Sequence, residues 1–125
     1  MTQHRTMPTK HKIAKYWKDS GAAPWSSHGW DYGEPSCMAC GWWKEEWDKA
    51  NTVAKKWAAS ELARCHVIPK YMGGKDSPEN LVLMCDVCHH RQPDSTDPED
   101  TYKFMRAQTF NPLAMIAGAS EQNAS

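Results

Sequence analysis

Four of the five cysteines occur as two closely spaced pairs, and these pairs restrict the possible folds more than any other feature of the sequence. Cys37 and Cys40 form the first Cys-x-x-Cys pair, and Cys85 and Cys88 form the second. Two intervening residues let both thiolates of a pair point at one ion, and two pairs supply the four sulfurs of a closed tetrahedral zinc site. We therefore predict a structural Zn²⁺ ion. Residues 41–84 separate the pairs, an insert much longer than in a simple zinc ribbon.

The same cysteines could instead form disulfides or a redox dithiol. The sequence contains no run of about 20 apolar residues that could span a membrane, and Met1–Lys12 lacks the apolar stretch of a secretory signal. We therefore expect a cytoplasmic protein without membrane contact, in which thiols stay reduced. A redox Cys-x-x-Cys motif is expected beside a βαβ pattern, which the sequence does not contain. Both observations favour the metal.

The charge of the chain is balanced overall but unevenly distributed. The net charge is zero over 125 residues, which gives no general argument for a nucleic-acid partner. Residues 1–18 contain no acidic side chain, whereas the segment after Pro93 is mainly acidic. The N-terminal segment could be a basic arm that follows phosphates or the solvated face of a helix. Its basic residues are Arg5, Lys10, Lys12, Lys15 and Lys18.

Hydrophobic spacing and capping residues predict four helices. Apolar residues recur at helical spacing between about residues 43 and 59, and we assign the tryptophans at 43, 47 and 57 to the core rather than to a cofactor box. Asp97 is a good N-cap and Pro98 suits a first helical position, so a helix is expected from there to about Thr109. The other two predicted helices cover residues 11–19 and 86–92.

Two short strands are predicted within the insert. The first covers Glu61–Ile68 and ends at Pro69, and the second covers Leu81–Met84. A turn-rich loop with Gly73–Gly74 joins them. The helix predicted at 86–92 follows directly, so this part of the chain has the order strand, strand, helix. We expect an α+β fold: a small zinc-stapled ββα unit with additional flanking helices.

The same segment carries an ordered set of motifs. They are His66-Val67-Ile68-Pro69, Gly73-Gly74, Asn80-Leu81-Val82-Leu83, and Cys85 to His89. In this order and spacing they resemble the HNH endonucleases, a branch of the ββα-metal nucleases. The resemblance covers about residues 61–90, with Cys37 and Cys40 as the other half of the zinc site. It divides the chain into a basic N-terminal arm with a short helix and loop (1–36), a nuclease core with an inserted helix (37–93), and a C-terminal helix with a flexible tail (94–125).

The resemblance implies a metal-dependent endonuclease that nicks DNA and leaves 5′-phosphate and 3′-hydroxyl ends. His66 would be the general base, because a neutral imidazole can take a proton from water near neutral pH. Asn80 would brace the loop and orient His66, and His89 would bind a second, catalytic divalent cation: Mg²⁺, Mn²⁺, Ni²⁺ or Zn²⁺. Nearby basic side chains could hold the nucleic-acid backbone. They are Arg64, Lys70, Lys75 and Arg91.

Cys65 departs from the family pattern, which commonly has an aspartate metal ligand at this position. A thiolate is a softer ligand than a carboxylate and suits zinc better than magnesium. Cys65 could bind a softer catalytic metal beside His89, it could be idle while water or substrate completes the coordination, or its presence could weaken the site. An ordinary buried thiol is the remaining interpretation.

Each candidate residue also has an ordinary structural explanation. His66 could be a packed strand histidine, Asn80 a turn residue before a strand, and His89 a replacement ligand of the structural zinc. A zinc-stapled module that binds nucleic acid without cutting it would explain the cysteines equally well. It would not explain why the three residues occur in register with the cysteine pairs, and we therefore favour the nuclease. DNA is the expected partner, and either a monomer or a homodimer is compatible with the sequence.

Overall fold

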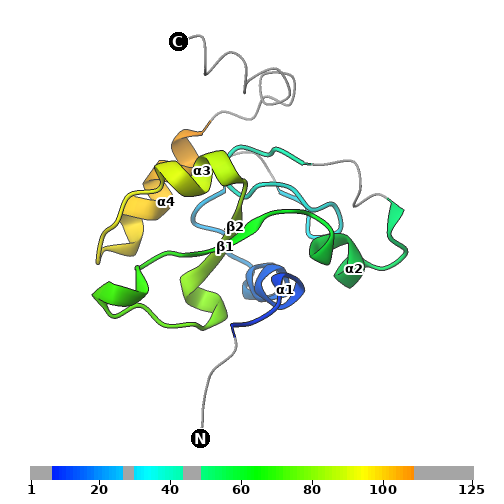
Figure 1. Cartoon of the computed structure of the whole chain (residues 1–125), viewed down its shortest axis with the longest axis horizontal. Coiled ribbons are helices and arrows are strands. Elements are labelled where there is room, and N and C mark those ends of the chain that lie inside the picture. The colour runs from blue at the N-terminus through cyan, green and yellow to red at the C-terminus, as the bar shows by residue number, and fades with distance from the viewer. Residues whose placement is uncertain (1–6, 27–29, 44–48, 109–125) are drawn as a thin grey trace, which may run out of the picture.

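A β-hairpin lies at the centre of the fold, with helices on both sides (Figure 1). The computed structural model describes residues 7–26, 30–43 and 49–108. Within these ranges the elements are, in chain order, α1 (Lys10–Ser20), α2 (Val53–Ala58), β1 (Ala63–His66), the 3₁₀ turns η2 (Lys70–Met72) and η3 (Pro78–Asn80), β2 (Leu81–Met84), α3 (Asp86–Arg91) and α4 (Pro98–Ala107). The predicted α+β class and the order ββα are confirmed.

The two strands pair antiparallel, with Ala63 opposite Met84 and His66 opposite Leu81. All four residues of β2 are buried, because other elements cover both of its faces. In β1, Cys65 is buried while Arg64 is exposed and His66 is half-buried. Neighbouring side chains in a strand point to opposite faces, so β1 has one face in the core and one face open to the loop that follows it. The second strand is confirmed at its predicted bounds, and the first is shorter than predicted at both ends.

Helix α1 covers β2. Thr9 caps its N-terminus by accepting a hydrogen bond from the backbone N–H of Lys12, and Gly21 ends it with φ 73°. Ile13, Ala14 and Trp17 are buried, and the Trp17 indole N–H donates to the carbonyl of Leu81 over 2.8 Å. The helix predicted at 11–19 is therefore confirmed. The helix begins at Lys10, one residue earlier than predicted.

The lysines of α1 lie on its solvent side. Lys12, Lys15 and Lys18 are exposed, and Asp19 forms ion pairs with Lys15 at 2.7 Å and with Lys18 at 3.6 Å. Such exposed pairs contribute little to stability, because solvent screens their charges. Within the described part of the helix, the basic character therefore belongs to the face opposite the core. Arg5 lies outside the described residues.

Helix α2 is much shorter than the predicted helix at about 43–59. It begins at Val53, because Thr52 caps it by accepting a hydrogen bond from the backbone N–H of Lys55. Trp43 is not helical and is 42% exposed, so it does not belong to the core. Trp57 is fully buried, as predicted, and its indole N–H donates to the carbonyl of Tyr32. Trp47 lies outside the described residues.

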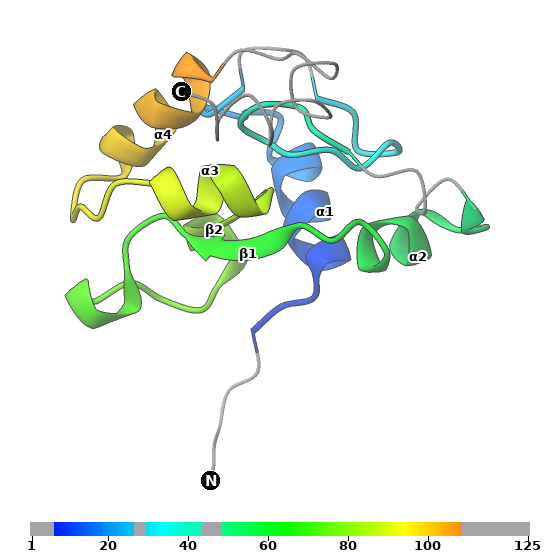
Figure 2. The same cartoon turned by 45° about the horizontal axis from the view of Figure 1, so that its top comes forward.

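Helices α3 and α4 follow one another beside the hairpin, with α3 against both strands and α4 beyond it (Figure 2). The helix predicted at 86–92 is confirmed as α3. Asp97 caps α4 by accepting from the backbone N–H of Glu99 over 3.0 Å, and Thr101 and Met105 are buried. The predicted capping is confirmed, although α4 ends at Ala107 rather than near Thr109. The predicted flexible tail begins outside the described residues. No helix in the described ranges has the length and apolar character needed to cross a bilayer.

Candidate active site and metal centre

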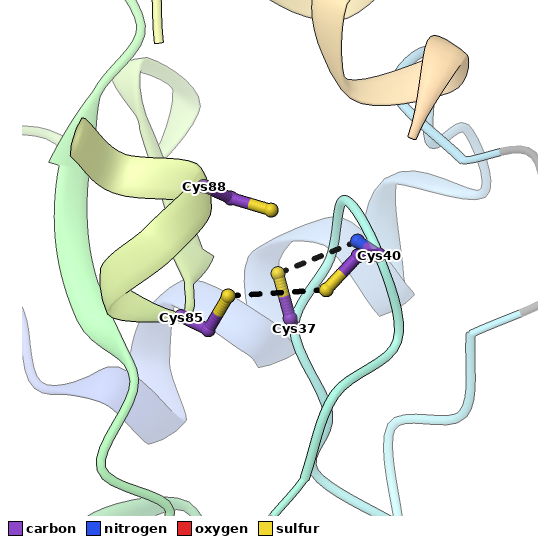
Figure 3. Close-up of side chains that lie close together, drawn as sticks. All are labelled: Cys37, Cys40, Cys85 and Cys88. Carbon is purple, nitrogen blue, oxygen red and sulfur yellow. Dashed lines mark hydrogen bonds between the residues drawn. The ribbon is translucent and has the colours of Figure 1, made fainter. Parts of the chain in front are cut away.

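The four paired cysteines converge on one point in the structure. Their Sγ atoms all lie within 4.8 Å of one another, and all four residues are buried. Cys37 and Cys40 are on a loop, whereas Cys85 is the N-cap of α3 and Cys88 lies in its first turn (Figure 3). The cluster therefore ties the start of α3 to a loop that is distant in sequence.

The geometry of this cluster fits a tetrahedral metal. The Sγ atoms of Cys40 and Cys85 are 3.8 Å apart. A tetrahedron with metal–sulfur bonds of about 2.3 Å has edges of about 3.8 Å. The Cys37 sulfur also accepts the backbone N–H groups of Ala39 and Cys40, each over 3.4 Å, which stabilises negative charge on that sulfur. The donor set thus suits a structural Zn²⁺ ion.

The four thiols alter one another's pKa values in opposite directions. Burial raises the pKa of Cys37, but hydrogen bonds from the other three thiols outweigh this and hold it well below its ordinary value. The pKa values of Cys40 and Cys88 are raised, mainly by their hydrogen bonds to the Cys37 sulfur. The protein alone therefore stabilises thiolate charge on only part of the cluster. A central divalent cation would let all four sulfurs ionise.

His66 ends strand β1 and faces a carboxylate. Its Nε2 lies 2.7 Å from Oδ1 of Asp76, and the Lys70 ammonium lies 2.8 Å from Oδ2 of the same carboxylate. The side chain of His66 is 21% exposed and that of Asp76 is 10% exposed. The hydrogen bond from Lys70, followed by that from His66, lowers the pKa of Asp76 to about 2. Asp76 is therefore ionised at neutral pH.

Asp76 belongs to none of the motifs in the sequence. The residue lies in a loop ten positions after His66, where its partner depends on how the loop folds back. The glycine pair was the available signal that the loop folds back tightly.

Asn80 connects the two ends of this loop. Its Oδ1 accepts the backbone N–H of Ile68 over 2.9 Å, and its Nδ2 donates to the carbonyls of Ile68 and Lys75, each over 3.0 Å. The residue is only 9% exposed. These are the contacts expected of a side chain that braces the loop. Because Ile68 follows β1 and Lys75 precedes Asp76, Asn80 also determines where Asp76 lies relative to His66.

Gly73 and Gly74 make the loop possible in two different ways. Gly73 has φ 95°, a left-handed conformation that favours glycine. Gly74 packs directly on the chain: a Cβ atom there would lie 1.8 Å from the Ile68 carbonyl oxygen and 2.8 Å from Asn80 Nδ2. Any larger residue at position 74 would therefore displace the same segment that Asn80 holds.

His89 is exposed on α3, one turn before Gln92. The Gln92 amide donates to the backbone carbonyl of His66 over 2.6 Å. The C-terminal end of α3, which carries His89, therefore lies close to the end of β1. No hydrogen bond joins the side chains of His66 and His89. Within the described ranges, the four cysteines are the only group of three or more metal-ligating side chains that converge.

Comparison with known families identifies this region. Residues 54–105 match the model of the HNH endonuclease family. The chain contains an HNH endonuclease domain. The match runs from α2 to α4 and includes His66, Asn80 and His89, but it excludes Cys37 and Cys40. Comparisons with curated proteins and with solved structures give no significant match.

Cys65 of the HNH domain faces away from the candidate site. The residue is fully buried, its thiol donates to the carbonyl of Ala63 over 3.4 Å, and burial raises its pKa to about 12. His66, the next residue, points to the opposite face of the strand. A protonated thiol in the core is poorly placed to bind an ion beside His89. These surroundings are those of an ordinary buried thiol, and a role of Cys65 as a catalytic metal ligand stays a prediction.

The four residues that we predict to bind the nucleic-acid backbone differ in their surroundings. Arg64 donates to the carbonyl of Pro8 over 3.1 Å and to that of Met7 over 3.5 Å, so it holds the segment before α1 beside β1. Lys70 is engaged by Asp76. Lys75 and Arg91 are exposed, and Lys75 lies in the loop that carries Asp76.

Proposed function

We propose that this chain is a metal-dependent HNH endonuclease that hydrolyses phosphodiester bonds of DNA, nicks one strand at a time, and leaves 5′-phosphate and 3′-hydroxyl ends. The observation that carries the proposal is the environment of His66. Its imidazole is partly exposed at the end of β1 and is hydrogen-bonded to an ionised carboxylate. The ββα order and the family match around it support the same function.

In this mechanism His66 is the general base. It takes one proton from a water molecule, and the resulting hydroxide attacks phosphorus while the bond to the 3′ oxygen breaks. The leaving oxygen then takes a proton from solvent. Lys75 and Arg91 would hold the phosphate backbone through their exposed charges. His89 would be the residue that holds a catalytic divalent cation, which would supply stabilisation of the negative charge that develops during cleavage.

We assign Zn²⁺ to the four cysteines as a structural ion. Bound there, it would fix the start of α3 against the loop of Cys37 and Cys40. Helix α3 also carries His89, and Gln92 at its end bonds to the His66 carbonyl. The bound zinc would therefore help to fix the positions of both imidazoles.

A plasmid-nicking assay tests the proposal. Supercoiled DNA is incubated with zinc-loaded protein and Mg²⁺, Mn²⁺, Ni²⁺ or added Zn²⁺, and open-circular product is quantified. We expect the native protein to nick and His66→Ala to be at least about 100-fold slower, since general-base catalysis contributes about 10²–10⁴-fold. His90→Ala is the matched control: this exposed histidine on α3 hydrogen-bonds to Asp86, its ring only neighbours that of His89, and its removal should leave the rate unchanged.

The product ends provide a second test. Nicks with 5′-phosphate and 3′-hydroxyl ends are sealed by DNA ligase without prior treatment, so ligase should return the open circles to closed form. If the native protein nicks no better than His66→Ala with any of the four metals on several substrates, the enzyme proposal is wrong.

A zinc-stapled module that binds nucleic acid without cutting it is the second candidate. Cys65 favours it, because the family's usual carboxylate is replaced by a thiol in the core. This function predicts that native protein and His66→Ala shift DNA equally in a gel and that neither nicks it. Sedimentation of the protein with and without DNA would distinguish a monomer from a homodimer in either case.

A further inference from the structure

Each oxygen of the Asp76 carboxylate contacts a side-chain nitrogen. Its Oδ1 lies 2.7 Å from Nε2 of His66, and its Oδ2 lies 2.8 Å from the ammonium of Lys70. The side chain is 10% exposed, whereas that of Lys70 is 69% exposed. A carboxylate this well covered and fixed at both oxygens can impose a hydrogen-bond direction on its partner.

We propose that Asp76 is a positioning residue that holds His66 in the tautomer protonated at Nε2, so that Nδ1 is the nitrogen that accepts the proton of the attacking water. An ionised carboxylate can only accept hydrogen bonds, so the ring nitrogen facing it must carry hydrogen. A neutral imidazole has a single N–H, which leaves Nδ1 unprotonated. The inference rests on the proposed nuclease function for its catalytic meaning, but the tautomer itself does not.

Both partners are fixed by further contacts. The Gln92 amide donates to the backbone carbonyl of His66, and Asn80 holds the carbonyl of Lys75, the residue before Asp76. Lys70 restrains the rotation of the carboxylate. The low pKa of Asp76, about 2, keeps it an acceptor throughout the neutral range. The direction of the hydrogen bond is thus set by the loop and not by the substrate.

Asp76→Asn should reverse this arrangement. Lys70 has donors only, so the amide oxygen of Asn would turn toward the ammonium and its NH₂ group would face His66. Nε2 would then have to accept, and the single proton would move to Nδ1, where it blocks the base. We expect kcat to fall by about 10²-fold or more, because the base itself contributes about 10²–10⁴-fold. KM should change little, since Asp76 makes no proposed contact with DNA.

The double variant Lys70→Met with Asp76→Asn tests whether the Lys70 ammonium sets the orientation of the new amide. Without the ammonium, the amide can turn its oxygen back to His66 and accept from Nε2 again. Part of the lost kcat should therefore return, although the double variant carries more changes than the single one. If Asp76 served only to stabilise the fold, the double variant would have a lower kcat than Asp76→Asn. Asp94→Asn is the matched control: this loop aspartate accepts from the Tyr71 hydroxyl and does not contact His66.

The deciding measurement is ¹⁵N NMR of the histidine rings in the full-length, zinc-loaded chain at about pH 9, well above the ordinary imidazole pKa of about 6.5. We expect the Nε2–H tautomer of His66 in the native protein and in Asp94→Asn, the Nδ1–H tautomer in Asp76→Asn, and a return toward Nε2–H in the double variant. The same tautomer in native protein and Asp76→Asn would overturn the inference, whatever the nicking rates. If the tautomers change as expected but native protein does not nick, the positioning stands and the nuclease proposal fails.

Discussion

Replacing Asn80 by Ala removes the three hydrogen bonds that its side chain makes to the loop of the candidate site. The backbone N–H and carbonyl of Ile68 and the carbonyl of Lys75 lose their partner together. A buried polar group left without a partner costs about 1–3 kcal/mol. Water can reach the exposed Lys75 segment but reaches Ile68 less easily. We therefore expect a loss of about 2–5 kcal/mol, a large part of the 5–15 kcal/mol that is typical of a small domain.

Urea unfolding at saturating zinc, followed by tryptophan fluorescence, measures this loss. Asn51→Ala is the control, since Asn51 is exposed in the segment before α2, and its change should stay within about 0.5 kcal/mol. The rate of nicking should fall further than the unfolded fraction explains, because Asp76 and His66 lose their fixed separation. A stability of Asn80→Ala within about 0.5 kcal/mol of the native value would refute the bracing role.

Four further predictions concern the metals and the thiols. Cys85→Ser should bind zinc poorly and lose cooperative unfolding, because zinc binding contributes to the free energy of folding; a full complement of zinc by mass spectrometry and an unchanged melting temperature would contradict this. His89→Ala should keep its zinc and its melting temperature but lose nicking, and full retained activity would place the catalytic ligand elsewhere. Cys65, with a pKa raised to about 12, should resist alkylation at pH 8 in the native protein, because its reactive thiolate is scarce and buried. Cys65→Ala should leave the metal preference of nicking unchanged, and a changed preference would restore Cys65 as a ligand.

Local patterns in the sequence predicted the elements that local chemistry determines. The Cys-x-x-Cys spacing predicted the cluster of four cysteines, and the run Leu81–Met84 predicted the second strand at its observed residues. Asp97 and Pro98 gave the start of α4, because a cap is a contact between near neighbours. The apolar spacing around 43–59 was misleading. Thr52 caps a later start, and Trp43 is exposed instead of packing with Trp57.

The parts of the candidate site that depend on tertiary packing were harder to predict from the sequence. Asp76 could not be assigned to His66 from spacing, because their contact requires the turn at Gly73 and the close approach of Gly74 to Ile68. The direction of Cys65 depended on which face of β1 meets the core, and one strand of alternating polarity did not settle this. The partner of Asp76 and the direction of the Cys65 side chain both depend on contacts between segments that are distant in sequence.

The sulfur cluster has a consequence for where this domain begins. The family-matched segment 54–105 carries two of the four sulfurs, and the other two come from Cys37 and Cys40. A fragment cut at the edge of the match would keep half a coordination sphere and would expose β2 where Trp17 now covers it. We therefore expect that the smallest piece able to fold alone reaches back through α1, and that it is considerably larger than the segment by which the family is recognised.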